Sequence, residues 1–516
     1  MKTLTGKNTT LNMGADEFRS AAHELTERIA TFMEELPEMN VTKGENPIAI
    51  RSFLTNKSLP LQGEESREIL KEASELLFGH SLFNGHPRFW GYITSSAAPI
   101  GALADFLASS VNANVGAFAL SPMATEIEQQ TIAWLSELIG YQANSGGIFV
   151  SGGNMANFLG FLAARRNKIG EKIREEGLAG LPLKPVIQPW GAYSQVPFPK
   201  PGKKHFTVYC AKGTHTWIQK AVDLFGHGTD SIRWIDLTDS QQMSVTHLQE
   251  QIRIDIRQGH QPFLVVGNAG SVSTGTVDPL REIANFCKTR DLWFHIDGAY
   301  GAPAAVVPEL ANLFDGLAEA DSIALDPHKW LYSPLEAGCI LVRDRKYLHD
   351  AFSFNPEYYN FGGNGYDQPV NFHEYGMQNS RGFRALKVWM SIKQMGKNGL
   401  TDMIRNNINL SEKLFHLVQE TPDLQAISQN LSITTFRYVP SDIEDEVYLN
   451  KLNQELLNKL QSGGEVFLSN AIVNGHYCLR PCIVNFRTSY ADLEALVSIV
   501  LREGKKIHES LLVTIE

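Results

Sequence analysis

The sequence has few cysteines and no long apolar run. Its five cysteines show no C-x-x-C spacing, so we predict neither a disulfide framework nor a zinc site, and we expect a reducing cytoplasm. The longest apolar stretch, residues 96–111, is interrupted by Pro99, Gly101 and Asp105, which argues against a membrane span. The N-terminal residues 1–13 lack the apolar core of a secretory signal, so we do not expect export.

An excess of basic residues is also missing. The chain carries 46 Lys and Arg against 56 Asp and Glu, a formal net charge of -10, and its cations are scattered. Nucleic-acid-binding proteins usually present a basic face, so we expect no nucleic-acid partner. Hydrophobic residues make up 43% of the 516 residues, enough for more than one hydrophobic core. We therefore predict a large globular protein with more than one lobe.

The pattern along the chain predicts three regions. Residues 1–90 carry helix-like apolar spacing without a partner of their own, so we expect a helical dimerisation segment that packs on a second subunit. Residues 91–385 alternate short β-rich runs with helical ones, and residues 386–516 form a smaller α/β region. We expect strands at 147–150, 206–209, 263–266, 292–296, 322–325 and 339–342 in the large domain, and at 432–436 and 476–479 in the small one. The alternation predicts an α/β fold with a mainly parallel sheet, whose ligand site lies beyond the carboxyl ends of the strands.

The run Ser-Gly-Gly-Asn-Met-Ala-Asn at residues 151–157 follows one expected strand and begins a helix. The backbone N–H groups of such a turn, here around Gly153 and Asn154, can bind a phosphate at the helix N-terminus. The alternative is a simple connection that uses glycine for its conformational freedom. A nucleophilic Ser151 is disfavoured, because the run lacks the G-x-S-x-G pattern.

Two further strand ends carry the chemistry. Lys329 follows Asp326, Pro327 and His328 in a tight turn, where its amine could form a Schiff base with an aldehyde cofactor. Asp297, at the end of another strand, could keep the nitrogen of a pyridine ring protonated, so that the ring accepts electrons from a substrate carbanion. Alone, each could be a surface lysine or a turn residue, but together they predict a pyridoxal phosphate site without a metal.

His215 follows a third strand and precedes a helix. Its imidazole could stack on the cofactor ring, opposite the face that Ala299 approaches, although a histidine that merely packs at a helix start would have the same sequence context. His328 is predicted to contact the phosphate or the substrate carboxylate.

Taken together, these motifs resemble the group II pyridoxal phosphate-dependent amino acid decarboxylases, which include aromatic-L-amino-acid, histidine and glutamate decarboxylases. The motifs that carry the resemblance are residues 86–92, 121–126, 151–157, His215, and residues 295–300, 326–330 and 384–389, in an order that spans nearly the whole chain. The resemblance implies fold type I and a homodimer with the active site at the subunit interface.

The family's catalytic tyrosine lies in a Pro-x-Tyr setting on a loop after the lysine, and Tyr358 matches this pattern after Pro356. The resemblance implies that Tyr358 protonates the substrate carbon once carbon dioxide has left. Relatives with phenylalanine there are aldehyde synthases, so a tyrosine favours decarboxylation. The register between Tyr358 and Tyr359 stays open, and both could instead be packing aromatics.

Two positions depart from the family pattern. Residues 269–274 are similar to a Gly-Thr-Thr stretch near the cofactor's phenolic oxygen, but Val272 cannot donate a hydrogen bond, so Ser271, Ser273 or the backbone must do so. Asp326 stands where relatives often have asparagine. Because an ionised carboxylate beside a phosphate is unfavourable, we expect Asp326 to point elsewhere.

We therefore predict a cytoplasmic carboxy-lyase that converts an L-amino acid, most simply an aromatic one, to its amine. Tyr92, Ser95 and Phe118 are the candidate substrate-contacting residues, in segments that the family places near the pocket, partly from the partner subunit. Core packing is the alternative for the aromatics. An acidic or diamino acid substrate, another fold type I activity (aldehyde synthase, lyase or aminotransferase) and a non-catalytic binding homologue remain the alternatives.

Overall fold

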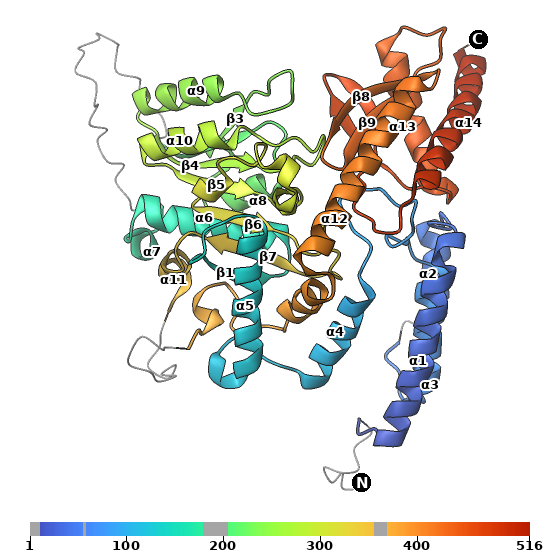
Figure 1. The fold of residues 1–516 in the computed structure, drawn as a ribbon, viewed down its shortest axis with the longest axis horizontal. Coiled ribbons are helices and arrows are strands. Elements are labelled where there is room, and N and C mark those ends of the chain that lie inside the picture. The colour runs from blue at the N-terminus through green and yellow to red at the C-terminus, as the bar shows by residue number, and fades with distance from the viewer. Residues whose placement is uncertain (1–10, 55–57, 179–204, 355–368, 516) are drawn as a thin grey trace.

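The protein has two lobes, each built on its own sheet and hydrophobic core (Figure 1). The computed structural model describes residues 11–54, 58–178, 205–354 and 369–515. The larger lobe contains a seven-stranded sheet and the smaller one a four-stranded sheet. The predicted α/β class is therefore confirmed.

The large sheet has the strand order β1-β7-β6-β5-β4-β2-β3. Its strands are β1 (Gly146–Val150), β2 (Phe206–Ala211), β3 (Ile232–Ile235), β4 (Gln261–Asn268), β5 (Trp293–Asp297), β6 (Ser322–Leu325) and β7 (Gly338–Val342). Only β7 runs antiparallel to its neighbours β1 and β6, and the remaining pairs are parallel. The predicted mainly parallel sheet is thus confirmed, and β3 is a strand that the sequence did not predict.

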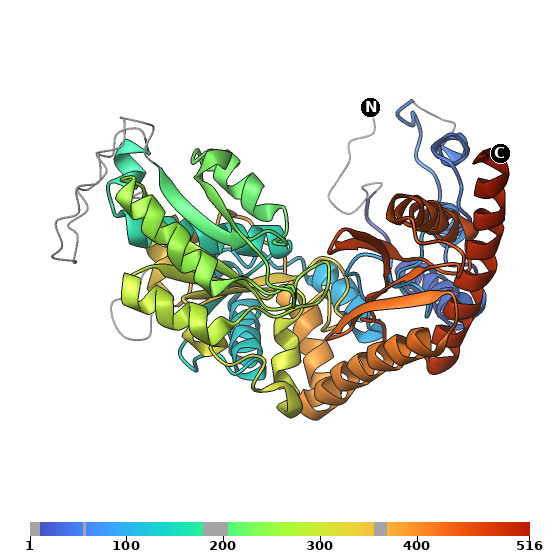
Figure 2. The same ribbon diagram turned by 90° about the horizontal axis from the view of Figure 1, so that it is seen from above.

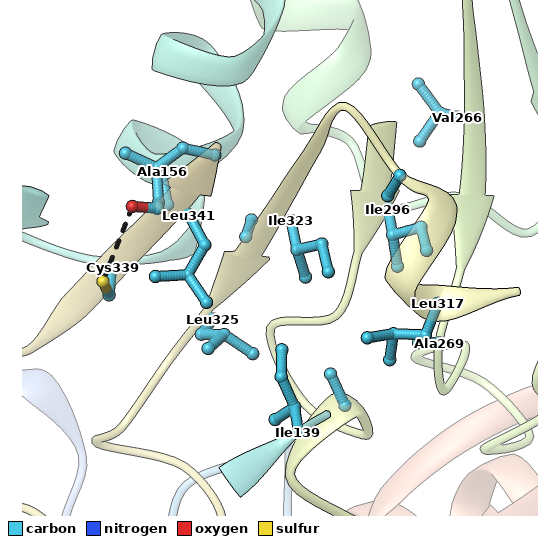
Figure 3. Packing of buried hydrophobic residues seen from close by; sticks show 14 of the residues in the cluster. Ile139, Ala156, Val266, Ala269, Ile296, Leu317, Ile323, Leu325, Cys339 and Leu341 are labelled. Atoms are coloured by element: carbon cyan, nitrogen blue, oxygen red, sulfur yellow. Dashed lines mark hydrogen bonds between the residues drawn. The ribbon is translucent and has the colours of Figure 1, made fainter. Parts of the chain in front are cut away.

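Apolar residues of adjacent strands form the centre of this lobe. Figure 3 shows Val266, Ile296, Ile323 and Leu341, from four different strands, in one buried cluster. Strands buried on both faces read as nearly continuous apolar runs, which is why the sequence located six of the seven. The surrounding helices include α5 (Pro122–Leu138), α6 (Gly153–Ile169), α8 (Trp217–Leu224), α9 (Val245–Arg257), α10 (Leu280–Arg290) and α11 (Lys346–Phe352). Of these, α6 packs along β4, β6 and β7 and begins directly after β1.

The small lobe has an antiparallel sheet of order β10-β11-β9-β8. Its elements are β8 (Leu424–Asn430), β9 (Ile433–Tyr438), β10 (Ser469–Val473), β11 (His476–Arg480), α13 (Glu446–Gly463) and α14 (Tyr490–Ile515). The long helix α12 (Ala385–Glu420) contacts α4 and α5 at one end and β8 and β9 at the other. It bends at Gly396, whose φ of 65° is not helical, and joins the two lobes when they are seen from above (Figure 2).

The N-terminal helices are α1 (Ala15–Glu35), α2 (Pro47–Phe53), α3 (Ser66–Gly79) and α4 (Pro99–Val111). Helices α1 and α3 lie side by side (Figure 1), with the rings of Phe32 and Phe78 stacked at 4.4 Å between centroids. Several apolar side chains of this region stay exposed, namely Phe18, Ile48, Phe53, Leu54, Ile69 and Leu77. Among the described helices, none combines the length and hydrophobicity that a membrane span requires.

Candidate functional site

A cavity of about 600 Å³ lies where the parallel strands of the large sheet end. Residues that follow different strands line it: Gly153 and Asn154 after β1, His215 after β2, Asn268 and Asp297 at the ends of β4 and β5, and His328 and Lys329 after β6. Pairing of the strands brings these distant segments together, as expected for an open α/β sheet.

Lys329 lies in a turn that is fixed by hydrogen bonds of its backbone. Its backbone N–H donates to the Asp326 carbonyl at 2.8 Å, and its Nζ lies 3.2 Å from Asp326 Oδ2. The Ser95 hydroxyl donates to the His328 carbonyl at 3.0 Å, and the next residue, Trp330, is fully buried. The side chain of Lys329 keeps 20% of its surface exposed, within the cavity, so its amine is accessible to a ligand there.

Asp297 ends β5, and both oxygens of its carboxylate accept hydrogen bonds. The indole N–H of Trp217 donates to Oδ2 at 2.8 Å, and the backbone N–H of Ala299 donates to Oδ1 at 3.3 Å. Together the two hydrogen bonds hold the carboxylate in a fixed orientation. Trp217 is fully buried at the start of α8, and the sequence analysis did not identify its role. Its position two residues after His215 was the one available signal.

His215 and His328 both line the cavity as neutral imidazoles. Burial lowers the pKa of His215, and the nearby charge of Asp297 only partly opposes this. Burial likewise lowers the pKa of His328. The Nδ1 atom of His215 accepts the backbone N–H of Trp217 at 3.3 Å, and Nδ1 of His328 accepts that of Ala337 at 3.0 Å. Each imidazole therefore carries its proton on Nε2.

The first turn of α6 forms one wall of the cavity. A Cβ added to Gly153 would come within 2.6 Å of Asp326 Oδ2, so only glycine fits without a shift. The N-terminus of this 17-residue helix carries free backbone N–H groups and a partial positive charge, both suited to a phosphate. Four residues after Gly153, Asn157 also lines the cavity, and its Oδ1 lies 2.7 Å from His295 Nε2.

His295 holds Asn157 from within the core. It is completely buried, its Nδ1 lies 2.7 Å from the Ser322 hydroxyl, and burial lowers the pKa of His295 to about 4. A neutral His295 donates through Nε2 to the amide oxygen of Asn157, which leaves the amide NH₂ of Asn157 available to the cavity.

One prediction made for an individual residue is contradicted, and another stays a prediction. Ser271 is not among the residues that line the cavity, although its neighbours Gly270 and Val272 are, and its hydroxyl lies 2.9 Å from that of Thr274. Its contact with the cofactor therefore stays a prediction. Asp326 was expected to point elsewhere, but its carboxylate lines the cavity against Gly153. Its attraction to the Lys329 amine accounts for this direction.

The candidate substrate residues lie outside the lining of this cavity. Tyr92 is 60% exposed and Phe118 is half-buried, whereas the buried Ser95 reaches the site only through the His328 carbonyl. The resemblance assigns them partly to a second subunit, so their role stays a prediction. Tyr358 and Tyr359 lie outside the described residues.

Several lining residues were given no individual role by the sequence analysis, although some of them lie in its motifs. They are Met155, Asn157, Asn268, Tyr300, Leu335 and Glu336. Asn268 is the last residue of β4. It could have been found in the same way as Asp297, because polar residues at the carboxyl ends of parallel strands face the ligand site. Across the described residues, no group of three or more His, Cys, Asp and Glu is arranged to hold a metal ion.

Comparison with known proteins gives matches along nearly the whole chain. The family model described as "Pyridoxal-dependent decarboxylase conserved domain" matches residues 47–187 and 201–439. The aromatic-L-amino-acid decarboxylase of Bacillus atrophaeus is 31% identical over 484 residues, which cover 94% of each chain. The phenylacetaldehyde synthase of Petunia hybrida is 27% identical over 506 residues, 95% of each chain. The solved structure of Catharanthus roseus tryptophan decarboxylase in complex with L-tryptophan superposes with a TM-score of 0.83 at 23% identity, covering 96% of this chain and 99% of that one.

Proposed function

The chain belongs to the family of pyridoxal-dependent decarboxylases and is a pyridoxal phosphate-dependent carboxy-lyase of fold type I, and we propose that its substrate is an aromatic L-amino acid, which it converts to the amine and carbon dioxide. One observation carries the proposal: a single cavity gathers the amine of Lys329, the carboxylate of Asp297, the imidazole of His215 and the N-terminus of α6. The relatives named for aromatic amino acids support this choice of substrate.

The cavity fits the cofactor chemically. The exposed amine of Lys329 suits an aldehyde, the doubly hydrogen-bonded carboxylate of Asp297 suits a protonated ring nitrogen, and the first turn of α6 at Gly153 suits a phosphate. A volume of about 600 Å³ is within the range of cofactor pockets.

Pyridoxal phosphate, when bound, supplies an electron-accepting ring that stabilises the negative charge left on the substrate carbon after decarboxylation. Lys329 would hold the cofactor through its amine. Asp297 would stabilise a protonated ring nitrogen, and Trp217 orients Asp297 by donating to Oδ2. His215 would cover the ring opposite Ala299, and its Nε2–H can donate a hydrogen bond there without bringing a second cation beside Lys329.

The proton returned to the substrate carbon comes from Tyr358 in this proposal. The support is the sequence alone: Pro356 and Tyr358 match the family's Pro-x-Tyr pattern, and a tyrosine rather than a phenylalanine favours release of an amine. The similarity to a phenylacetaldehyde synthase makes an aldehyde the alternative product.

We also propose that the enzyme works as a cytoplasmic homodimer. The exposed apolar side chains of α1 to α3, such as Ile48 and Leu77, would be covered by a second copy of the chain. All five cysteines are unpaired and buried, which suits a reducing compartment. Light scattering coupled to gel filtration tests the dimer, and a monomer at micromolar concentration would contradict it.

Incubation with a panel of amino acids tests the reaction and the substrate class. The purified enzyme with its cofactor receives L-tryptophan, L-tyrosine, L-phenylalanine, L-glutamate or L-2,4-diaminobutyrate, and carbon dioxide, amine, ammonia and aldehyde are measured together. We expect carbon dioxide and amine in equal amounts from an aromatic substrate. Equal amounts of aldehyde and ammonia would instead establish an aldehyde synthase, and ammonia or a keto acid without carbon dioxide would exclude decarboxylation.

Reduction with borohydride tests the role of Lys329. Borohydride should fix the cofactor to the protein, and peptide mass spectrometry should find it on Lys329 and not on Lys387, a buried lysine that pairs with Asp105 at 2.9 Å. The variant Lys329→Ala should bind the cofactor without covalent attachment and lose at least about a thousandfold in turnover. A cofactor adduct on another lysine would overturn this assignment.

A further inference from the structure

The carboxylate of Asp326 is a buried charge that lacks the partners of a structural aspartate. It is 2% exposed, and its Oδ1 atom has no hydrogen-bond partner in the part of the chain that the structure describes. The buried Asp278 differs, because Oδ1 accepts from Met243 N–H at 2.7 Å and Oδ2 from Asn268 N–H at 2.7 Å. A buried oxygen without a partner is costly, so the free oxygen of Asp326 points to a ligand.

Its position indicates which part of the ligand it meets. Asp326 Oδ2 lies so close to the first residue of α6 that a Cβ at Gly153 would approach it to 2.6 Å. The same atom lies 3.2 Å from Lys329 Nζ and 3.6 Å from His328 Nε2. Asp326 therefore lies at the helix N-terminus, which is the end of the cavity suited to a phosphate.

The charges around the cavity make an ionised Asp326 unfavourable once a phosphate enters. Lys329 is the one lysine or arginine among the described lining residues, whereas Asp297, Asp326 and Glu336 are acidic. Burial lowers the pKa of both lining histidines, so neither supplies a second cation near neutral pH. A phosphate beside an ionised carboxylate would place like charges together, which disfavours ionisation of one of them.

We propose that Asp326 takes up a proton when the phosphate group of the cofactor binds, and that its neutral carboxyl group then donates a hydrogen bond to the phosphate. The inference rests on the proposed function and adds a coupling between cofactor affinity and pH. It explains how a carboxylate can occupy this position. The titratable and charged groups that face Asp326 are Lys329 and His328 from its own turn, His215 from the segment after β2 and the buried thiol of Cys339 from β7.

Calorimetric titration of the full-length, cofactor-free protein tests the proposal. The probe is pyridoxine 5′-phosphate, which lacks the aldehyde and therefore leaves the Lys329 amine unreacted. Affinity is measured between about pH 7 and about pH 9, where the phosphate ester is mainly the dianion, in two buffers of different ionisation enthalpy. Uptake of one proton predicts that affinity falls by up to about tenfold for each pH unit. Asp326→Asn, which resembles the neutral acid, should lose this dependence and take up about one proton less.

Two controls isolate the coupling. Glu336→Gln removes another carboxylate that lines the cavity, but Glu336 is 48% exposed and pairs with Arg384 at 2.9 Å, so this variant should keep the wild-type dependence on pH. Pyridoxine without the phosphate should give the same pH dependence with wild type and with Asp326→Asn. The ³¹P signal of the bound probe should stay that of a dianion across the range, because the proton resides on Asp326.

The proposal would be overturned if wild type and Asp326→Asn showed the same dependence of affinity on pH and the same proton uptake. That outcome would not affect the decarboxylase assignment, which the incubation with amino acids tests separately. A ³¹P shift typical of the monoanion would also overturn it, because the proton would then reside on the phosphate. If Asp326→Asn does not fold, the wild-type titration decides alone, and absence of net proton uptake refutes the coupling. Binding of pyridoxine as tight as that of its phosphate would refute the coupling together with the phosphate site.

Discussion

The two oxygens of the Asp297 carboxylate differ in their environment, and the difference lies with Trp217. The indole donates to Oδ2 at 2.8 Å, whereas the backbone N–H of Ala299 makes a longer contact of 3.3 Å with Oδ1. A short, charge-assisted hydrogen bond to a carboxylate fixes the plane of that carboxylate. Trp217 is therefore a positioning residue for Asp297.

Replacing Trp217 with phenylalanine should weaken the electron-accepting state of the cofactor. We expect Trp217→Phe to lower kcat by about tenfold, since a hydrogen bond to a charged group contributes about 1.5 kcal/mol. The absorbance of the bound cofactor should also change its dependence on pH. Trp90→Phe is the matched control, because Trp90 is equally buried but donates its indole N–H to the Thr488 hydroxyl at 3.0 Å, away from the cavity. The same change in both variants would mean that Trp217 acts through packing alone.

At the residue scale the sequence located side chains that come directly after a strand. Gly153, His215, Asp297 and Lys329 all follow from this rule, and the structure gathers them in one cavity. Trp217 could not be found in this way. Its contact with Asp297 spans 80 residues and depends on the packing of α8 against the end of the sheet, which local sequence does not encode.

At the scale of elements, a buried ion pair holds β1 in place. Glu128 of α5 accepts from the Phe149 N–H at 3.0 Å and from Arg381 at 2.5 Å, and Arg381 donates to the Phe149 carbonyl at 2.7 Å. Both polar groups of the Phe149 backbone are thus bound by one pair, whose side chains are at most 1% exposed. Phe149 is followed within a few residues by Gly153, so the pair also positions the start of α6.

Neutralising one member of this pair should destabilise the protein and weaken cofactor binding. We expect Glu128→Gln to cost about 3 kcal/mol of unfolding free energy, because it leaves the Arg381 charge buried without compensation. Urea unfolding and titration with pyridoxal phosphate measure the two effects. Glu309→Gln is the control: Glu309 pairs with Arg405 at 2.9 Å on the surface and should change neither quantity appreciably. Stability lost without any change in cofactor affinity would contradict the positioning role.

The strands that the sequence analysis missed all lie at the edges of the two sheets. The strands β3, β8 and β10 were not predicted, and all three are edge strands in the observed strand orders. β10 alternates buried and exposed residues, and β8 is mostly half-buried and polar, so neither contains an apolar run. The central strands were found, and so was β1, an edge strand whose residues are all buried. An edge strand without an apolar run depends on tertiary packing for its pairing, which is why the pattern of these short segments did not reveal it.

At the scale of the whole molecule, the core of the large lobe requires neutral histidines. His227 is buried against Phe263 and Phe161, with ring centroids 5.3 Å and 5.2 Å away, and its Nε2 has no hydrogen-bond partner among the described residues. Burial, together with the positive charge of Arg165, lowers the pKa of His227 to about 3. His295 is a second such residue, with a pKa lowered to about 4. Both histidines make the native state sensitive to acid.

The sign of this effect follows from the two states of the chain. In the unfolded state a histidine takes up a proton below about pH 6.5, whereas in the folded state His227 stays neutral until about pH 3. Stability is therefore fully present above about pH 6.5 and is lost as the pH falls toward the folded-state value. Between about pH 7.5 and about pH 5, each of the two histidines should remove about 2 kcal/mol of unfolding free energy.

Replacing His227 with phenylalanine should remove the part of the acid destabilisation that His227 causes. We expect urea unfolding of His227→Phe to show about 2 kcal/mol less destabilisation than wild type between about pH 7.5 and about pH 5, whatever the variant costs at the higher pH. The exposed His416, replaced by glutamine, is the control and should leave the pH dependence unchanged. Because His295 remains in both proteins, some acid sensitivity should persist in His227→Phe. An unchanged pH dependence in His227→Phe would show that His227 is not held neutral by the core, and that carboxylates dominate the response of the whole molecule to acid.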